Sequence, residues 1–301
     1  MTKVRSRSAA KTARPPIPVA QSRTELAIAR AALEGPVSVV MTMGALHAGH
    51  AALIRTAASY GRVLVTIFVN PLQFGPNEDL ERYPRTLGAD LELCAAAGAD
   101  LVFAPTPRVM YPNGEPLVRV DPGPGGMVLE GASRPGHFAG VLTVVAKLLN
   151  LTRPQFAFFG EKDFQQLTLI RQMVTDLDMP VEIVGVPTWR DDTGLALSSR
   201  NRYLHREQGP TALTLSRAIA AGVAAAPSGR EAVLHAARSI LAREAGLAID
   251  RLDLIDPVTL ADTAHGPARL LVAAILPGPS GPIRLIDNSA LTLPPQTPGM
   301  G

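Results

Sequence analysis

The chain has 301 residues, of which 47% are hydrophobic and 18% are charged, and its formal net charge is +3. This length allows one large or two modest domains, and no apolar run approaches the roughly 20 residues that span a bilayer, which excludes a membrane span. Six basic residues precede the first acid, Glu25, so the rest of the chain is close to neutral, which argues against nucleic-acid binding by a broad basic surface.

Two features of the chain bear on where the protein works. Residues 1–21 are basic, rich in serine and alanine, and lack the hydrophobic segment of a secretory signal. Their composition overlaps that of organelle transit peptides, but Pro15, Pro16 and Pro18 interrupt any long amphipathic helix, which favours a disordered extension. The single cysteine, Cys94, excludes an internal disulfide and is expected in the core, so we expect a cytoplasmic protein.

The stretch from Val37 to Ala58 predicts a strand, a tight turn and the start of a helix. Residues 37–41 are apolar, and residues 51–58 have helix-forming composition. His47 and His50 lie at the mouth of this helix, where backbone N–H groups and the positive end of the helix dipole suit a polyanion. Imidazole adds donors that can become cationic. Surface or capping histidines are the alternative, and the strand–turn–helix context favours phosphate binding.

Apolar strands alternate with helices through the first two thirds of the chain. Residues 63–69 are nearly all apolar and rich in β-branched side chains, as in a parallel strand that is covered on both faces. This alternation predicts an α/β fold with a doubly wound parallel sheet. The other predicted strands are 101–104, 156–159 and 181–186, and the predicted helices are 24–33, 87–97, 141–150 and one that carries Leu167, Ile170 and Val174.

Asn70 and Gln73 come directly after the predicted strand 63–69. Open α/β sheets bind their ligands outside the carboxyl ends of the strands, so both residues are candidates for the site. Simple turn chemistry is the alternative, but it does not require an amide at position 73.

A Pro- and Gly-rich passage, residues 105–126, predicts a long loop with a brief strand near 117–120. Loops of this length in compact domains are usually functional or mobile. Arg134 and His137 follow it, shortly before the helix 141–150, in a second place suited to anions. The alternative is that Arg134 and His137 are surface residues without a ligand, as an isolated Arg-x-x-His usually is.

Gly160, Lys162 and Asp163 follow the predicted strand 156–159 at once. Gly160 allows close approach of the backbone, Lys162 offers a mobile cation, and Asp163 can accept hydrogen bonds from the hydroxyls of a ribose. Acids that only complement a helix dipole are the alternative. That alternative leaves Lys162 unexplained, because a cation is unfavourable at a helix N-terminus without an anion.

Residues 191–201 combine hydroxyls, a guanidinium and a glycine in one short segment. Ser198, Ser199 and Arg200 could wrap a triphosphate, because arginine binds oxygens in pairs and serines add short donors. A capped surface loop is the alternative.

The composition shifts after Leu204 and predicts a second, smaller α+β unit with few candidate catalytic groups. We therefore expect two domains, at residues 22–188 and 189–301. The predicted helices of the second unit are 211–225 and 231–244, and its predicted strands are 251–255, 270–275 and 283–286.

Taken together, the motifs resemble those of the pantothenate synthetase family, a branch of the H-x-G-H nucleotidyltransferase superfamily. The resemblance runs from about residue 24 to residue 290 in the family's motif order, so it is far more specific than any single motif. The segments that carry it are residues 42–50 (TMGALHAGH), 68–74 (FVNPLQF), 83–86 (YPRT), 133–138 (SRPGHF), 159–166 (FGEKDFQQ), 197–201 (LSSRN) and 285–288 (LIDN).

The resemblance implies an enzyme that joins pantoate to β-alanine with ATP and Mg²⁺ through a pantoyl-adenylate, releasing AMP and pyrophosphate. It also implies a homodimer with a Rossmann-like N-terminal domain and a small C-terminal domain that covers the site. No membrane or nucleic-acid partner belongs to this picture.

The resemblance also assigns roles residue by residue. Catalysis would use His47, His50, Lys162, Ser198, Ser199 and Arg200. The ATP site would add Met43, Gly49, Gly160, Asp163, Val186 and Leu197 to these. Pantoate would contact Met43, Gln73 and Gln166, with less definite roles for Asn70, Arg134 and His137. The protein ligands of Mg²⁺ and the residues that bind β-alanine are not assigned.

One residue departs from the family's pattern. Met41 stands where the family usually has a proline before Thr42, which puts the rigidity of the turn in doubt. An adenylyltransferase with another acceptor is the competing enzyme hypothesis, but it leaves Gln73 and Gln166 without a role. A nucleotide-binding protein without catalysis is the third hypothesis, and it predicts the loss of a phosphate-binding group.

Overall fold

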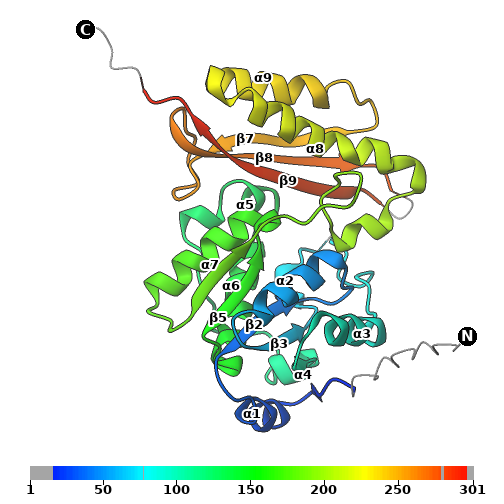
Figure 1. The fold of residues 1–301 in the computed structure, drawn as a ribbon, viewed down its shortest axis with the longest axis vertical. Helices are drawn as coiled ribbons and strands as arrows, with labels where there is room; N and C mark the ends of the chain where they lie inside the picture. The colour runs from blue at the N-terminus through cyan, green and yellow to red at the C-terminus, as the bar shows by residue number, and fades with distance from the viewer. Residues whose placement is uncertain (1–15, 77, 279–280, 297–301) are drawn as a thin grey trace, which may run out of the picture.

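The computed structural model describes residues 16–76, 78–278 and 281–296, and this part contains two β-sheets (Figure 1). The larger sheet has the strand order β1-β4-β3-β2-β5-β6, and all its neighbouring strands are parallel. Its strands are β1 (Val19–Ala20), β2 (Val37–Thr42), β3 (Arg62–Ile67), β4 (Leu101–Phe103), β5 (Phe156–Gly160) and β6 (Glu182–Val186).

Helices cover both faces of the larger sheet. Val39 and Leu64 belong to one buried cluster with α1, α6 and α7, whereas Val40 and Val65 belong to another with α2 and α3. Successive strand residues point to opposite faces, so both faces are apolar. Cys94 is buried in the second cluster, as expected of a core residue. The helices are α1 (Arg23–Ala31), α2 (Ala48–Ala58), α3 (Leu87–Ala97), α6 (His137–Thr152) and α7 (Phe164–Asp176). The predicted doubly wound α/β sheet is confirmed.

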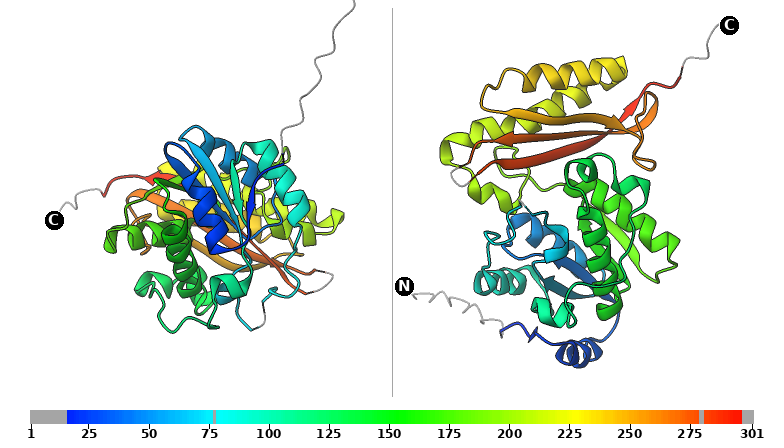
Figure 2. Two further views of the ribbon diagram at one scale, coloured as in Figure 1. Left: turned by 90° about the horizontal axis from the view of Figure 1, so that it is seen from below. Right: turned by 180° about the vertical axis from the view of Figure 1, so that it is seen from behind.

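The smaller unit has two helices on one face of an antiparallel sheet, and its other face is turned toward the larger unit (Figures 1 and 2). The helices share one buried cluster with the sheet, which confirms the predicted α+β character. Its elements are η5 (Arg206–Gln208), α8 (Gly209–Ala224), η6 (Ala226–Ser228), α9 (Arg230–Leu241), β7 (Ala248–Ile255), β8 (Gly266–Leu276) and β9 (Ile283–Leu293). The domain division at residues 188 and 189 stays a proposal.

The brief strand expected at residues 117–120 is wrong. Leu117 and Val118 are exposed, and in the described structure the segment's backbone makes one hydrogen bond, from Val120 N to Thr143 Oγ1 at 3.0 Å. A strand needs a neighbour with which to pair, and β1 already occupies the sheet edge beside β4. The short helices near this loop are α4 (Pro107–Met110), η2 (Pro124–Gly126) and α5 (Glu130–Ser133).

The N-terminal extension is shorter than predicted. Val19 and Ala20 lie within the expected extension of residues 1–21, yet they pair with β4, and Ala20 is buried. Residues 1–15 of that prediction lie outside the described residues. Across the described ranges, every helix is too short or too polar to cross a membrane.

Gly140 on α6 offers a test of how closely this helix packs on η1 (Pro71–Gln73), the short helix that follows β3. A Cβ at this position would lie 2.1 Å from Leu72 O and 2.8 Å from Gln73 N. We expect Gly140→Ala to lower the free energy of unfolding by about 1–3 kcal/mol, because the methyl group must displace backbone. Chemical denaturation measures this.

The matched control is Gly88→Ala on α3, where nothing lies within 4 Å of the added Cβ. Alanine favours helix over glycine, so the control should be as stable as the wild type or more stable. Equal stability of Gly140→Ala and Gly88→Ala would contradict the close packing.

Candidate active site

The strand order places a topological switch point at the carboxyl ends of β2 and β5. From β2 the chain continues to β3 and β4 on one side of the sheet and later to β5 and β6 on the other. Ligands of open α/β sheets bind at such a point. The turn after β2 carries His47 and His50, and the loop after β5, η3 (Glu161–Asp163), carries Lys162. Two of the predicted motifs therefore meet at this crevice.

A buried carboxylate holds the turn after β2. Gly44 and Ala45 have positive φ values of 85° and 52°, and the second is costly for a residue with a side chain. Asp90, in the first turn of α3, accepts hydrogen bonds from Ala45 N at 3.1 Å and from Leu46 N at 2.8 Å. The turn is thus fixed by hydrogen bonds, although Met41 replaces the usual proline.

His47 is the N-cap of α2, and His50 lies in its first turn. His47 Nδ1 accepts a hydrogen bond from Gly49 N at 3.2 Å, and His50 Nδ1 accepts one from His47 N at 3.3 Å. A backbone N–H can only donate, so each neutral ring carries its proton on Nε2 and keeps that N–H for a ligand. A Cβ on Gly49 would lie 3.0 Å from the His47 ring, so glycine lets this ring cover the helix start.

Both histidines are neutral at pH 7. Burial, together with nearby Lys162 and Arg202, lowers the pKa of His47 to about 4. Burial, together with His47 and Lys162, lowers the pKa of His50 to about 3. The ring centroids lie 4.1 Å apart, so two charged rings would repel. In the free protein the two rings are therefore neutral N–H donors, and the prediction that they can become cationic beside bound phosphate is not tested.

The segment η4 (Ser199–Tyr203) crosses from the smaller unit onto the turn after β2. Ser199 Oγ donates to Ala45 O at 3.3 Å, and Arg202 donates to Leu46 O at 3.1 Å. Ser198 Oγ caps the segment by accepting from Arg200 N at 3.2 Å. Ser198, Ser199 and Arg200, which are predicted to bind phosphate, thus belong to a segment that is bonded to the turn after β2 and line the same cavity as His47 and His50.

Side chains of β8 and β9 hold the loop that carries Lys162. Asn288 Nδ2 donates to Lys162 O at 2.7 Å and to Glu161 O at 3.1 Å. Buried Arg269 donates to Asn288 Oδ1 at 2.8 Å, pairs with the Glu161 carboxylate at 3.1 Å, and lies over the ring of Phe164. The smaller unit therefore fixes the backbone of Lys162, whose ammonium lies 3.6 Å from an Asp163 oxygen.

The two predicted glutamines differ in how they are held. Gln73 is buried, and its Oε1 accepts from Asn70 Nδ2 at 3.0 Å. Gln166 makes no hydrogen bond with a described residue through its amide, whereas its neighbour Gln165 bonds to the carbonyls of Gly125 and Val128. One amide of the pair is therefore fixed by the protein and the other is adaptable.

Arg134 and His137 form a network beneath Gln73. Arg134 donates to both carboxylate oxygens of Glu78, at 2.7 and 2.5 Å, and to His137 Nε2 at 2.9 Å. His137 Nδ1 donates to Gln73 O at 2.8 Å. Burial and Arg134 lower the pKa of His137 to about 4, so this ring is neutral as well. In the free protein Arg134 and His137 therefore hold the backbone carbonyl of Gln73 in place.

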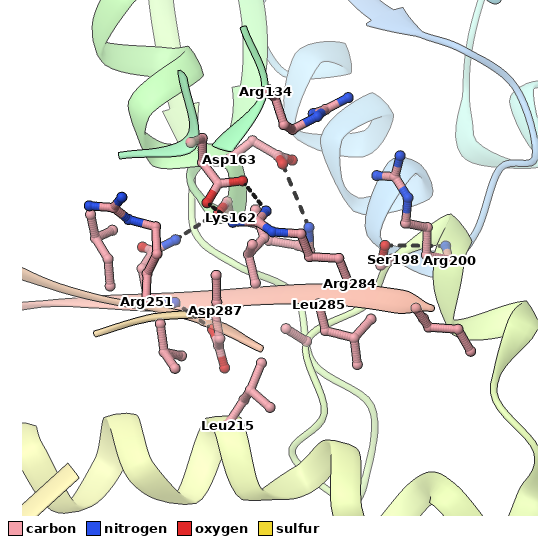
Figure 3. Close-up of a pocket in the computed structure, with 18 of the residues that line it drawn as sticks. Arg134, Lys162, Asp163, Ser198, Arg200, Leu215, Arg251, Arg284, Leu285 and Asp287 are labelled. Carbon is pink, nitrogen blue, oxygen red and sulfur yellow. Dashed lines mark hydrogen bonds and ion pairs between the residues drawn. The ribbon is translucent and has the colours of Figure 1, made fainter. Parts of the chain in front are cut away.

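Two cavities meet at these residues. One of about 620 Å³ lies between the two units, where Lys162 and Asp163 face Arg284 of β9 (Figure 3). The other, of about 250 Å³, lies at the switch point, and we name it the switch-point cavity. Only this smaller cavity is lined by the two histidines of the first motif, so we place the chemistry there, although it is not the larger of the two.

The structure brings every predicted site residue to the switch-point cavity. Residues of the larger unit surround it together with residues 187–189 and 197–200, which belong to the segment that leads into the smaller unit. The residues that line it are Met43, His47, Gly49, His50, Asn70, Gln73, Arg134, His137, Gly160, Lys162, Asp163, Gln166, Val186, Leu197, Ser198, Ser199 and Arg200.

Comparison with known proteins agrees with this arrangement. A family model described as Pantoate-beta-alanine ligase matches residues 18–290. The chain belongs to this family. The "Pantothenate synthetase" of Salinispora arenicola is 58% identical over 278 residues, which cover 91% of this chain and 97% of that relative. The chain is therefore a ligase of the pantoate-beta-alanine ligase family.

Solved structures of the family have the same fold. Pantothenate synthetase from Thermus thermophilus superposes with a TM-score of 0.83 at 46% identity, covering 91% of this chain and 99% of that one. A pantoate-beta-alanine ligase from Francisella tularensis, described as complexed with Beta-gamma ATP and Beta-alanine, superposes with a TM-score of 0.75 at 34% identity. It covers 91% of this chain and 97% of its own.

Sequence reasoning missed several residues that shape this ligase site. Asp90 was the one acid in the first turn of a mostly apolar helix, a signal that could have been followed. Arg202 comes directly after the motif at residues 197–201. Asp79, which pairs with Arg200 at 3.0 Å, and Arg269 gave no local signal, because their partners are far away in the chain.

The neutral histidines predict how stability depends on pH. In the unfolded chain both rings take up protons near pH 6.5, whereas in the folded protein they do so only near pH 4 and pH 3. The unfolded state therefore binds more protons below about pH 6.5, so this contribution to stability is present above that pH and is lost as the pH falls toward 4.

Replacing both His47 and His50 by glutamine should flatten the fall in unfolding free energy between pH 6.5 and pH 4. Urea unfolding at a series of pH values measures it. His235→Gln, an exposed histidine on α9, is the control and should leave the slope as in the wild type. A double variant with the wild-type slope would show that the two rings are not held neutral.

Proposed function

We propose that this ligase condenses pantoate with β-alanine at the expense of ATP, through a pantoyl-adenylate, with release of AMP and pyrophosphate. One observation carries the proposal: phosphate-binding groups and a pair of glutamine amides line one cavity at the switch point. The Francisella tularensis relative, a ligase complexed with Beta-gamma ATP and Beta-alanine, supports it.

The groups at one end of the cavity suit the transfer of an adenylyl group. A carboxylate that attacks the α-phosphorus meets an anionic nucleotide, so the chemistry needs positioning and donors that follow charge onto the leaving pyrophosphate. Lys162, Arg200 and the Nε2–H groups of His47 and His50 supply such donors from three separate segments. Ser198 and Ser199 add hydroxyls beside them.

Another part of the cavity lining suits a small hydroxy acid. Gln73 and Gln166 can bond to the hydroxyl and carboxylate oxygens of pantoate. Phe68, Val141 and Val144 also line the cavity and give an apolar surface for its methyl groups. This part of the lining separates the proposal from an adenylyltransferase with another acceptor, which has no use for the two amides.

The second step needs exclusion of water. The β-alanine amine attacks the carbonyl carbon of the adenylate, the C–N bond forms, and AMP leaves, while hydrolysis of the mixed anhydride competes. We propose that the smaller unit, as a C-terminal domain at residues 189–301, covers the site during this step. The bonds from Asn288 to the loop that carries Lys162 support this role.

We propose that Mg²⁺ binds at this site together with the nucleotide, through its phosphates. Among the described residues, no three histidine, cysteine, aspartate or glutamate side chains are grouped so as to hold a metal ion. Mg²⁺ often keeps several waters and binds through substrate phosphates with few protein ligands. When bound in this way it would neutralise phosphate charge, and Asp163 is a nearby carboxylate on the cavity wall.

A homodimer also remains a proposal. Leu117, Val118 and Met127 are exposed in and just beyond the long loop, which is compatible with a contact between two chains. The molar mass in solution distinguishes one chain from two. A cytoplasmic location stays a prediction from the sequence.

The direct test is release of AMP in the presence of ATP, Mg²⁺ and β-alanine, with and without pantoate. We expect AMP and pyrophosphate only with pantoate, and none when Mg²⁺ is chelated. AMP release that is indifferent to pantoate would favour an enzyme with another acceptor. ATP binding without turnover, with both co-substrates saturating, would favour a nucleotide-binding protein.

Lys162→Ala tests the phosphate-binding wall. We expect the adenylation rate to fall by about 10²-fold or more, because a cation that meets charge developing in the transition state is removed. Arg217→Ala, an exposed cation on α8, is the control and should turn over at the wild-type rate. The rate is measured in a single turnover, and thermal unfolding checks the fold. An unchanged rate in Lys162→Ala would remove this residue from the mechanism.

A further inference from the structure

Three side chains form a buried chain of hydrogen bonds that ends at the switch-point cavity. The Tyr111 hydroxyl donates to Asn70 Oδ1 at 2.7 Å, and Asn70 Nδ2 donates to Gln73 Oε1 at 3.0 Å. Tyr111 is 7% exposed and Asn70 is 1% exposed. Gln73 and Asn70 line the cavity, whereas Tyr111 lies behind them and lines neither cavity.

The direction of this chain follows from groups that can act in only one way. The carbonyl of Gly140 can only accept, and it lies 3.2 Å from Asn70 Nδ2. The N–H of Leu72 can only donate, and it lies 3.4 Å from Asn70 Oδ1. These partners identify the two ends of the Asn70 amide. The atom of Gln73 that meets Asn70 Nδ2 is therefore its oxygen, and its amide nitrogen is the free end.

The free end of Gln73 is open to a ligand. Its Nε2 has no hydrogen-bond partner among the described residues, and it is not among the buried polar atoms that lack one, so it is accessible from the cavity. An amide N–H₂ suits an oxygen of an acid or of a hydroxyl. With the opposite orientation, Gln73 would present its oxygen and repel a carboxylate.

Tyr111 makes the shortest hydrogen bond to Asn70, and its ring is held in place. Its ring lies 5.9 Å from that of Phe68, and Lys147 Nζ lies 5.5 Å from its centroid. Burial raises the pKa of Tyr111, so its hydroxyl stays a donor. Loss of this hydroxyl would remove the shortest of these bonds and leave Asn70 held by the longer bonds to Leu72 N and Gly140 O, so the amides of Asn70 and Gln73 would turn more readily.

We propose that Tyr111 is a positioning residue for the acid substrate: through Asn70, its hydroxyl keeps the amide nitrogen of Gln73 directed at the oxygens of pantoate. The role rests on the proposed function, in which Gln73 contacts pantoate. Tyr111 acts through two other side chains and does not touch the reacting atoms.

Tyr111→Phe tests this role, because it removes one oxygen and keeps the ring. We expect KM for pantoate to rise about fivefold, the usual effect of one buried neutral hydrogen bond, while KM for ATP and for β-alanine changes less than about twofold. Tyr60→Phe is the matched control. The Tyr60 ring packs against Phe156 and Phe158, away from the network. Loss of its hydroxyl should therefore leave the KM values for pantoate, ATP and β-alanine unchanged.

A second readout separates positioning from a general effect on folding. The measurement compares kcat/KM for pantoate with kcat/KM for analogues that lack one of its hydroxyls. The ratio of the two values reports how strongly the site discriminates between substrates by their oxygen atoms. We expect Tyr111→Phe to reduce this ratio for at least one analogue and Tyr60→Phe to preserve it. Calorimetric titration of pantoate in the presence of a non-hydrolysable ATP analogue should show the same loss of affinity.

Each outcome decides the proposal. An unchanged pantoate KM, or an equal rise of KM for all three substrates with an unaltered ratio, would assign Tyr111 to the fold alone and overturn the role. A wild-type enzyme without pantoate-dependent AMP release would overturn the proposed function, and this role with it. Normal wild-type release together with a selective defect in Tyr111→Phe would support both.

Discussion

The site depends on donors of the smaller unit that hold main-chain oxygens of the larger one. Asn288 bonds to the carbonyls of Glu161 and Lys162, and Arg202 bonds to the carbonyl of Leu46. These oxygens belong to the two loops that end β5 and β2, so the bonds fix the loops relative to each other. Neither loop makes a site alone, because one carries the histidines and the other the lysine. The smaller unit is thus part of the site's architecture as well as a cover for it.

Charge in the free site is balanced before any ligand arrives. Arg200 pairs with Asp79, Arg134 with Glu78, and Lys162 lies near Asp163, while both histidines are neutral. A buried cation without a partner would be costly, and a pair keeps it aimed at the cavity at a smaller cost. An entering triphosphate offers more negative charge than one carboxylate, so it can compete for these cations. Neutral N–H donors complete the site without further repulsion.

The fold and the residues that line the switch-point cavity could be predicted from the sequence, whereas the charge state of several of them could not. The sheet followed from apolar strands, and the convergence of the motifs followed from their positions after strands. The supposed strand near Leu117 failed because pairing depends on a neighbour, and a local pattern cannot show that Val19–Ala20 takes the edge. The neutral state of His47 could not be predicted for a similar reason, since burial and the approach of Lys162 and Arg202 depend on contacts far apart in the chain.

Asp90 and Tyr111 show a further limit of reading motifs. Motifs mark residues that contact a ligand, whereas these two residues hold parts of those motifs in place. Their role is visible in hydrogen bonds across long sequence separations, from Leu46 N to Asp90 and from Tyr111 to Asn70. The acid at the start of α3 was a weak signal for Asp90, but the partners of both residues are visible only in the structure.

Gln73 and Gln166, which contact pantoate in the proposed function, differ in how they can recognise its oxygen atoms. An amide has nearly the same shape at both ends, so a glutamine that can turn accepts either a donor or an acceptor and discriminates little. Gln73 is held at its oxygen and therefore demands an acceptor from the substrate. Gln166, without a fixed partner among the described residues, can adapt to whatever group the first contact leaves beside it. In the proposed function, one fixed amide is sufficient to select pantoate by its oxygen atoms. The contact with Gln73 sets the orientation of this small acid, and the Gln166 amide then turns to match the group beside it.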